Sequence, residues 1–276
     1  GGASWFHETA GREGDGKVAG GVIKAETLWA CTMCLACVEA CPVGIEHVPL
    51  IVQLRRRLVS DGTLDANLQG VLEKIGRYGN SFGQSERMRG RWTQGLPFQV
   101  KDARKEAVEY LWFVGDYASY DPSLQELTRA VARVFQRLGL DFGILYDGER
   151  NSGNDVRRVG EEGLYQLLVE KNLAVLGTAQ FKEIVTTDPH SYNTLRFEYP
   201  EFGGAFRVRH YTEVLSEALA GGRVPVARRL TGVATYHDPC YLSRYTEVTE
   251  APREILRALG LTLVEMGRNL ATSFCC

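Results

Sequence analysis

The spacing of hydrophobic residues changes along the chain and divides it into unlike segments. Residues 1–25 are rich in glycine and predict a loop or linker. Within 45–59 the apolar side chains recur at the period of an amphipathic helix. Residues 60–105 are polar and mixed, so we expect a winding connection that holds one short helix. Because helix-forming residues flank 31–41, that stretch is expected to lie between helices.

From about residue 108, strand-like and helix-like segments alternate, which predicts βαβ units and a layered α/β region. Asp121, Pro122 and Ser123, with Glu126 three residues after Ser123, form the signature of a helix start. Glycines that follow apolar helical runs mark two of the helix ends. We expect strands at 110–114, 142–146, 183–187, 233–236 and 261–265, and helices at 124–138, 161–173 and 252–259.

The composition is that of an ordinary globular protein. The sequence has 276 residues, enough for two modest domains with cores of their own. The formal net charge of −2 gives no electrostatic reason to expect nucleic-acid binding. No run of about 18 apolar residues predicts a membrane span, and no signal peptide is evident. Because the sequence starts at Gly1 rather than at methionine, we interpret it as a fragment with both ends missing.

Four of the seven cysteines form one tight run, Cys31-x2-Cys34-x2-Cys37-x3-Cys41, followed at once by Pro42. This spacing is typical of bacterial motifs that bind cubane iron–sulfur clusters, in which the fourth cysteine ligates the other cluster of a pair. We therefore expect Cys31, Cys34 and Cys37 to hold one [4Fe-4S] cluster. Cys41 would complete a second cluster, whose remaining ligands would lie upstream of the sequence. The alternative is a zinc knuckle, whose ligands more often form two pairs separated by a dozen or more residues.

The other three cysteines form a second group, Cys240-x34-Cys275-Cys276. Adjacent cysteines do not readily form a disulfide with each other, but both thiolates can face one metal assembly. We predict that the three ligate a further cluster; the alternative is buried structural thiols or a reactive cysteine. His237 and Asp238, just before Cys240, would hydrogen-bond that cluster or carry protons, unless Asp238 simply caps a turn.

The interval in this second group also occurs earlier in the chain, without cysteine. Asp116-x34-Asn151-Ser152 has the same spacing, and the x2 pair Asp188 and Ser191 follows. We infer two copies of one module, of which the first has lost its thiols and should bind no cluster. His190, inside that pair, is then interpreted as a remnant of the loop rather than as a metal ligand.

Several stretches together resemble one known family. They are WACTMCLACVEACP (29–42), VGDYASYDP (114–122), RRVGEEGLYQLL (157–168), IVTTDPHSYNTL (184–195), HYTEVL (210–215) and TYHDPCYLSRY (235–245). They resemble the heterodisulfide reductase D-like iron–sulfur proteins, whose cysteine-rich domains carry a "CCG" signature. Related proteins include iron–sulfur subunits of glycerol-3-phosphate dehydrogenase and glycolate oxidase, and oxidoreductases that accept electrons from electron-transfer flavoprotein.

The resemblance implies an α+β multidomain protein. An α-helical ferredoxin-type domain with two [4Fe-4S] clusters would precede two α/β cysteine-rich repeats, the first without its cysteines. The expected division is a linker at 1–25, the second half of the cluster domain with its connection at 26–105, the degenerate repeat at 106–225 and the truncated second repeat at 226–276.

These expectations favour an iron–sulfur electron-transfer subunit of an oxidoreductase, with no catalytic residue of its own. Electrons would pass from a flavoprotein to a quinone, a haem or another membrane acceptor. The protein would lie at the cytoplasmic face of the membrane, held there by a missing domain or by a partner. The redox alternative is the iron–sulfur subunit of a heterodisulfide, 2-hydroxy-acid or glycerol-3-phosphate oxidoreductase, and the non-redox alternative is a zinc-binding interaction protein. Arg55, Arg56 and Arg57 could dock an acidic partner, although such runs more often form a solvated helix face.

Overall fold

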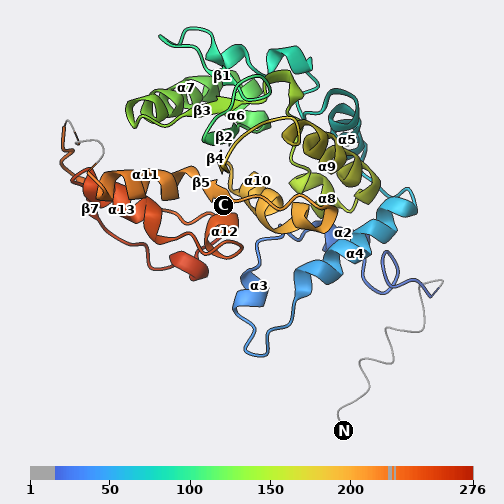
Figure 1. Ribbon diagram of the computed structural model, residues 1–276. Helices are drawn as coiled ribbons and strands as arrows, with labels where there is room; N and C mark the ends of the chain where they lie inside the picture. Colours follow the sequence, from blue (N-terminus) through green and yellow to red (C-terminus); the bar gives the residue numbers. More distant parts are fainter. Residues whose placement is uncertain (1–15, 223–225, 227, 276) are drawn as a thin grey trace.

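The computed structural model describes residues 16–222, 226 and 228–275 (Figure 1). Cys276 and the first fifteen residues of the predicted linker therefore lie outside the described residues. The remainder of the linker forms turns and one isolated parallel bridge between Ala19 and Ile23. No helix in the described part of the chain is long and apolar enough to cross a membrane.

The N-terminal part is helical, as predicted. It contains α2 (Ala25–Trp29), α3 (Ala36–Glu39), α4 (His47–Ser60) and α5 (Ala66–Tyr78). The cysteine run lies between α2 and α4 and passes through α3. The apolar face of α4 buries Val48 and Val52 against Met33 of the cysteine loop, and Leu58 against Leu28 of α2. Packing of α4 therefore fixes the position of the cysteine loop.

A five-stranded parallel sheet forms the centre of the molecule, in the order β1-β3-β2-β4-β5. The prediction from the alternating pattern is confirmed for the three inner strands, although β3 is shorter than expected. The two outer strands were not predicted. The strands are β1 (Lys101–Asp102), β2 (Tyr110–Phe113), β3 (Phe142–Ile144), β4 (Glu183–Thr186) and β5 (Val208–His210).

Helices cover both faces of this sheet. Trp112 of β2 packs under α7 (Pro122–Arg137) and α11 (Tyr211–Ala220), with its ring edge-on to Phe135 at 5.2 Å. Leu111 and Phe113 point to the opposite face, in the same core cluster as residues of α5 and α9 (Glu162–Leu176). Burial on both faces explains why β2 is a wholly apolar run and why the two central residues of β4, Ile184 and Val185, are apolar.

The start of α7 differs from its prediction. Asp121, not Ser123, caps the helix: its carboxylate accepts a hydrogen bond from the amide of Ser123 at 2.8 Å. Glu126 does not complete a capping box and instead pairs with Arg129 and Arg133 on the exposed face. Proline at the first helical position fits this arrangement, because that position needs no amide donor.

A small two-stranded parallel sheet follows the central one. Its strands, β6 (Val233–Ala234) and β7 (Thr262–Leu263), are shorter than predicted. Between them lie α12 (Cys240–Ser243) and α13 (Glu250–Ala258). The helix α13 packs along α11, where Ser216 hydrogen-bonds Glu254, and this contact joins the small sheet to the central one (Figure 1).

The remaining elements are short. They are η1 (Glu86–Met88), η2 (Arg91–Thr93), α6 (Asp116–Tyr120), η3 (Tyr146–Gly148), α8 (Asn154–Val159), α10 (Pro189–Asn193), η4 (Thr194–Glu198), η5 (Tyr199–Phe202) and η6 (Leu270–Thr272).

The buried imidazole of His210 makes stability depend on pH. Burial lowers the pKa of His210 to about 4 from its ordinary 6.5, so the folded state keeps this ring neutral. As the pH falls below the ordinary value, the unfolded chain binds the proton first, and stability is lost until the folded pKa is reached. We expect the wild-type protein to lose about 2 kcal/mol more than His210→Gln between about pH 7 and about pH 5. Urea unfolding at both pH values measures this difference, and parallel pH profiles would contradict it.

Candidate functional site

The cysteine run forms a curled loop. Met33 and Leu35 both have left-handed backbone conformations, with φ of 58° and 61°. Such angles are unfavourable for bulky side chains and persist only where packing compensates. Here Met33 is only 3% exposed and packs beneath Val48 and Val52. The core under α4 therefore holds the loop in this conformation.

Backbone amides in this loop point at sulfur. Met33 N–H approaches Cys31 Sγ at 3.5 Å, and Ile45 N–H approaches Cys41 Sγ at 3.4 Å. Hydrogen bonds from Ile45 and Val43 lower the pKa of the Cys41 thiol. Because the thiolate is the form that binds metal, these amides favour the ligating state.

Cys34 has a similar environment. Burial alone would raise the pKa of its thiol, but hydrogen bonds from Ala36 and Thr32 lower it overall. The guanidinium of Arg244 acts in the same direction. Its Nη2 atom is buried and has no hydrogen-bond partner among the described residues. An unused cationic donor and amides aimed at sulfur suit an anionic sulfur-bound group, so the donor set of this loop fits an iron–sulfur cluster.

Arg244 joins the two cysteine groups. Its Nε donates to the carbonyl oxygen of Cys34 at 2.6 Å, although 210 residues separate them. Its Nη1 donates to the carbonyl oxygens of Ser273 at 2.7 Å and Ala271 at 3.0 Å. Cys240 lies four residues before Arg244, in α12, and Cys275 lies two residues after Ser273. One side chain thus ties together the segments that carry Cys34, Cys240 and Cys275.

Asp238 fixes the same region from the other side. Its carboxylate makes a bidentate ion pair with Arg253 at 2.7 and 2.8 Å and accepts the amide of Leu270 at 2.7 Å. Ser273 Oγ donates to the carbonyl oxygen of Asp238 at 3.0 Å. Asp238 therefore holds the strand end before Cys240 against the segment before Cys275. This role was not among those predicted for it, because the partner Arg253 is distant in the sequence.

The described cysteines differ in exposure. Cys240 is buried, Cys31, Cys34 and Cys41 are half-buried, and Cys37 and Cys275 are exposed. Within 16–222, 226 and 228–275, no three histidine, cysteine or acidic side chains are arranged around a single metal ion. In a cubane cluster each thiolate binds a different iron, so its ligands stand farther apart than those of one ion.

The arginine run of α4 does not form one solvated face. Arg55 is buried and donates to the carbonyl oxygens of Leu28 and Cys31 at 2.7 and 2.6 Å. Arg56 pairs with Glu162 of α9, and only Arg57 is largely exposed. The run therefore supports the cysteine loop and the α4–α9 contact rather than presenting a basic patch.

The five residues predicted at the lost ligand positions do come together. Asn151 Nδ2 donates to Asp116 Oδ2 at 2.7 Å. Ser191 Oγ hydrogen-bonds Ser152 Oγ at 3.0 Å and Asp188 Oδ2 at 2.6 Å. The sequence spacing thus predicted a real spatial group, formed where the chain leaves β2 and β4. Its atoms are oxygens and amide nitrogens that satisfy one another.

Arg89 and Glu149, which the sequence did not single out, complete this group. The buried guanidinium of Arg89 pairs with Asp116 and with Glu149, each at 2.8 Å. Glu149 also accepts the amides of Val114 and Gly115. Burial would lower the pKa of Arg89, but the charges of Asp116 and Glu149 raise it. Nothing in the polar, irregular segment around Arg89 indicates such burial.

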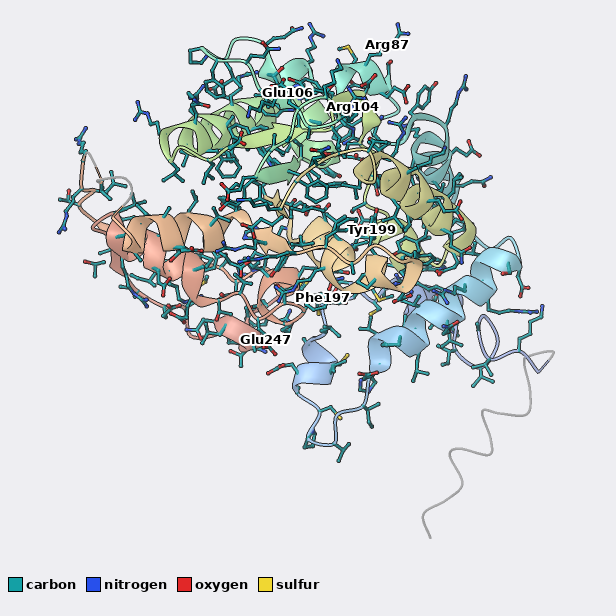
Figure 2. The ribbon with its side chains drawn as sticks, viewed as in Figure 1. Arg87, Arg104, Glu106, Phe197, Tyr199 and Glu247 are labelled. Atoms are coloured by element: carbon teal, nitrogen blue, oxygen red, sulfur yellow. The ribbon has the colours of Figure 1, made fainter. Side chains whose placement is uncertain are left out.

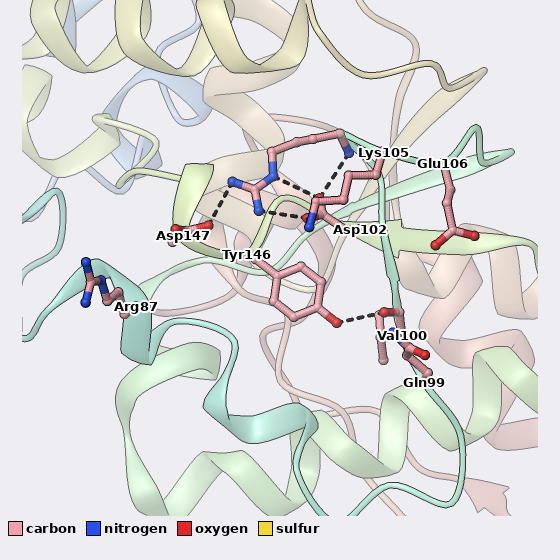
Figure 3. Close-up of a pocket in the computed structure, with 9 residues that line it drawn as sticks. Arg87, Gln99, Val100, Asp102, Lys105, Glu106, Tyr146 and Asp147 are labelled. Carbon is pink, nitrogen blue, oxygen red and sulfur yellow. Dashed lines mark hydrogen bonds and ion pairs between the residues drawn. The ribbon is translucent and has the colours of Figure 1, made fainter.

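One of two surface hollows lies at the group formed by Asp116 and Asp188, and the other lies elsewhere. One, of about 550 Å³, is lined by Asp116, Ser152, Asp188 and His190. The other, of about 430 Å³, is an open hollow beside β1, where Arg104 pairs with Asp102 and Asp147 and Tyr146 donates to the Val100 carbonyl oxygen (Figure 3).

The second hollow is remote from the cysteines. Arg87, Arg104 and Glu106, which line it, lie at the top of the view in Figure 2, whereas α3 lies at the bottom of the same view in Figure 1. Asp102, Asp147, Arg104 and Lys105 pair with one another, so we assign this hollow no chemistry.

Comparison with known proteins gives a consistent result. A family model for the cysteine-rich domain (CCG) matches residues 110–196 and 234–276. The chain is 43% identical to the probable iron–sulfur-binding oxidoreductase FadF of Bacillus subtilis, over 93% of this chain and 38% of that protein. It is 36% identical to the EtfAB:quinone oxidoreductase of Syntrophomonas wolfei, over 92% of this chain and 36% of that protein.

A third relative is more distant. The D component of the dihydromethanophenazine:CoB–CoM heterodisulfide reductase of Methanosarcina mazei is 30% identical, over 89% of this chain and 60% of that protein. No solved structure matches. The chain spans well under half the length of the first two relatives. The predicted resemblance is confirmed: this chain carries the cysteine-rich CCG domain and is homologous to proteins named as iron–sulfur oxidoreductases and to the D component of heterodisulfide reductase.

Proposed function

We propose that this chain is an electron-transfer part of an iron–sulfur oxidoreductase. Cys31, Cys34 and Cys37 hold one [4Fe-4S] cluster, and Cys41 completes a second whose other ligands lie outside the sequence. A bound cluster supplies one-electron storage. The observation that carries the proposal is the bridge from Arg244 to both the Cys34 loop and the Ser273 segment.

A further cluster belongs to the second group, Cys240, Cys275 and Cys276. Support comes from the two tethers that flank it, Asp238 to Leu270 and Ser273 to the Asp238 carbonyl. These contacts draw the segments before Cys240 and before Cys275 together. The buried position of Cys240 at the start of α12 suits a ligand shielded from water.

An aromatic contact joins the two cysteine groups. Tyr241 and Tyr245 stack at 4.1 Å with planes 3° apart, and Tyr245 Oη donates to the Met33 carbonyl oxygen at 2.7 Å. Arg158 contacts the hydroxyl of Tyr241. Close packing between the two cysteine groups favours electron transfer between the clusters that they would hold. The same packing fixes the position of each group.

Electrons enter from a flavoprotein and leave toward a quinone or haem, in an assembly at the inner face of the membrane. Support comes from the name of the Syntrophomonas relative, EtfAB:quinone oxidoreductase. Most of each of the first two relatives lies outside the matched region, and we assign the contact with the membrane to that part.

The two matched regions are two copies of one module. In each, two parallel neighbouring strands enclose a short helix and a longer one: β2, α6, α7 and β3 in the first, and β6, α12, α13 and β7 in the second. The short helices start at Asp116 and at Cys240. We assign the copies to 106–225 and 226–276, after a linker at 1–25 and the cluster domain at 26–105. Because hydrogen-bonded oxygens replace thiols in the first copy, it serves as a scaffold and the heterodisulfide alternative loses one of its sites.

Iron content separates the two copies. We expect Cys34→Ala to lower iron and labile sulfide by roughly one cubane, about four atoms of each per chain. Ser152→Ala should leave both unchanged. Asp116→Ala should also keep its iron but lose roughly 3 kcal/mol of stability, because Arg89 then keeps only one of its two carboxylates. Iron, sulfide and zinc analysis of the anaerobically purified full-length protein, with urea unfolding, checks all three. Zinc without sulfide in the wild-type protein contradicts the proposal.

Arg244 should control how firmly the cluster loop is held. Arg244→Leu removes charged hydrogen bonds to three carbonyl oxygens, each worth about 1.5–3 kcal/mol. We expect iron loss to a chelator to become at least about tenfold faster. Arg57→Leu is the matched control, because Arg57 is exposed and its one ion pair among the described residues is with Asp61. Equal rates of iron loss in the two variants would show that Arg244 does not hold the loop.

A further inference from the structure

The larger hollow lies at a special point of the central sheet. From β2 the chain moves to β3 on one side and then crosses to β4 on the other side. At such a switch point the two connections separate and leave a crevice at the carboxyl ends of the strands, where open α/β sheets bind ligands. Gly115 and Asp116 follow β2, Thr187 and Asp188 follow β4, and all four line the cavity.

The cavity has the size and lining of a small-molecule site. Its volume of about 550 Å³ falls within the range of ligand pockets, roughly 300–1,000 Å³. One wall is apolar, formed by Leu124, Leu127 and Val131 of α7 with Tyr117 and Tyr211. Leu127 and Tyr117 are 63% and 61% exposed, so apolar surface continues outward from the cavity.

The polar side of the cavity leaves few groups unpaired. Asp116 is neutralised by Arg89, and Asp188 accepts hydrogen bonds from Ser191 and its own helix. His190 Nδ1 lies 3.2 Å from Asp188, whereas its Nε2 has no hydrogen-bond partner among the described residues. The ring N–H of Trp112, which is fully buried and lines the cavity, is likewise unpartnered within the described residues.

The charges at the cavity disfavour an anionic occupant, and the apolar wall favours a neutral one. Asp155 and Asp188 line the cavity, and no lysine or arginine is among the described residues that do so. Burial would lower the pKa of His190, but its hydrogen bond to Asp188 and the charges of Asp188 and Asp155 raise it, against the smaller effect of Arg158. His190 is thus a hydrogen-bond donor held beside an otherwise acidic and apolar wall.

Aromatic rings lead from this donor to the cysteine loop. The ring of His190 lies 4.2 Å from that of Tyr241, which stacks on Tyr245 at 4.1 Å. Tyr245 in turn donates to the Met33 carbonyl oxygen, between Cys31 and Cys34. An occupant of the cavity that touches His190 is therefore in continuous contact with the candidate cluster site.

We propose that this cavity binds a neutral, mainly apolar ring compound with conjugated carbonyls, the chemical class of the quinones, and that it is the site where electrons leave the chain. This inference rests on the proposed function, because the proposed clusters supply the electrons. The reduced clusters deliver two electrons one at a time, and the two carbonyls become two hydroxyls. His190 Nε2 gives one proton and is reprotonated by water, and water gives the other.

Menadione is the probe for binding. Equilibrium dialysis of the anaerobically purified full-length protein should show saturable binding. Leu127→Trp fills the mouth of the cavity from an exposed position, and His190→Gln removes the proposed hydrogen-bond donor. Each should raise Kd at least about tenfold, which corresponds to the free energy of about one hydrogen bond. Leu167→Trp, at an exposed position on α9 outside the cavity, is the matched control and should leave Kd unchanged. Equal affinity in Leu127→Trp and Leu167→Trp overturns the site.

The electron step is tested on the same samples. After reduction with dithionite and removal of excess, menadione should reoxidise the wild-type protein and the Leu167→Trp variant faster than Leu127→Trp by at least about tenfold. Iron and sulfide are measured in parallel. If the protein contains iron but binds no menadione, the proposed binding site is wrong and the cluster proposal stands. If the protein binds menadione specifically but contains no iron, the cluster proposal and the electron step are wrong and the binding site stands.

Discussion

A single guanidinium, that of Arg244, connects the parts of this molecule on which its chemistry depends. It spans 210 residues of sequence to reach the Cys34 carbonyl oxygen and also binds the segment before Cys275. The helix α12 has four residues and the strands beside it have two each, so few backbone hydrogen bonds hold them in place. Charged hydrogen bonds to carbonyl oxygens give direction as well as energy, and a lysine could not satisfy three acceptors with the same planar geometry.

The two matched regions balance charge in different ways. In the first, Arg89 lies between Asp116 and Glu149, and serines and an asparagine satisfy the remaining atoms. Each buried charge of this network has an opposite charge beside it, although Arg89 Nε has no hydrogen-bond partner among the described residues. In the second, Asp238 is matched by Arg253, but Arg244 keeps a buried donor unused beside the cysteine loop. The unused donor of Arg244 differs from that of Arg89 in its position, because it lies beside the Cys34 thiol, where a bound anionic group would accept its hydrogen bond.

The sequence predicted the elements with a clear hydrophobic period and the group of residues with a repeated spacing. The inner strands followed from runs such as Tyr110–Phe113, and the interval between Asp116 and Asn151 correctly placed both in one group. The outer strand β5 was missed because three residues carry no readable period. The roles of Arg55, Arg89 and Asp238 were missed or misjudged for a different reason. Each depends on partners far away in the chain, and local patterns hold no information about them.

The cavity at the switch point could not be predicted from the sequence either. Its existence depends on the order in which β2, β3 and β4 lie side by side, and on oxygen atoms that pair across it instead of enclosing a cluster. The position of His190 against Tyr241 follows from the packing of α10 on α12, two helices too short to show a pattern. A candidate binding site at the switch point can therefore be recognised only from the folded structure.

The most direct measurement is anomalous diffraction at the iron edge from crystals of the anaerobically purified full-length protein. The account predicts an iron peak bounded by Cys31, Cys34 and Cys37, with Arg244 bound to the Cys34 carbonyl oxygen beside it. A map without iron near these sulfurs, or with zinc in its place, would contradict it.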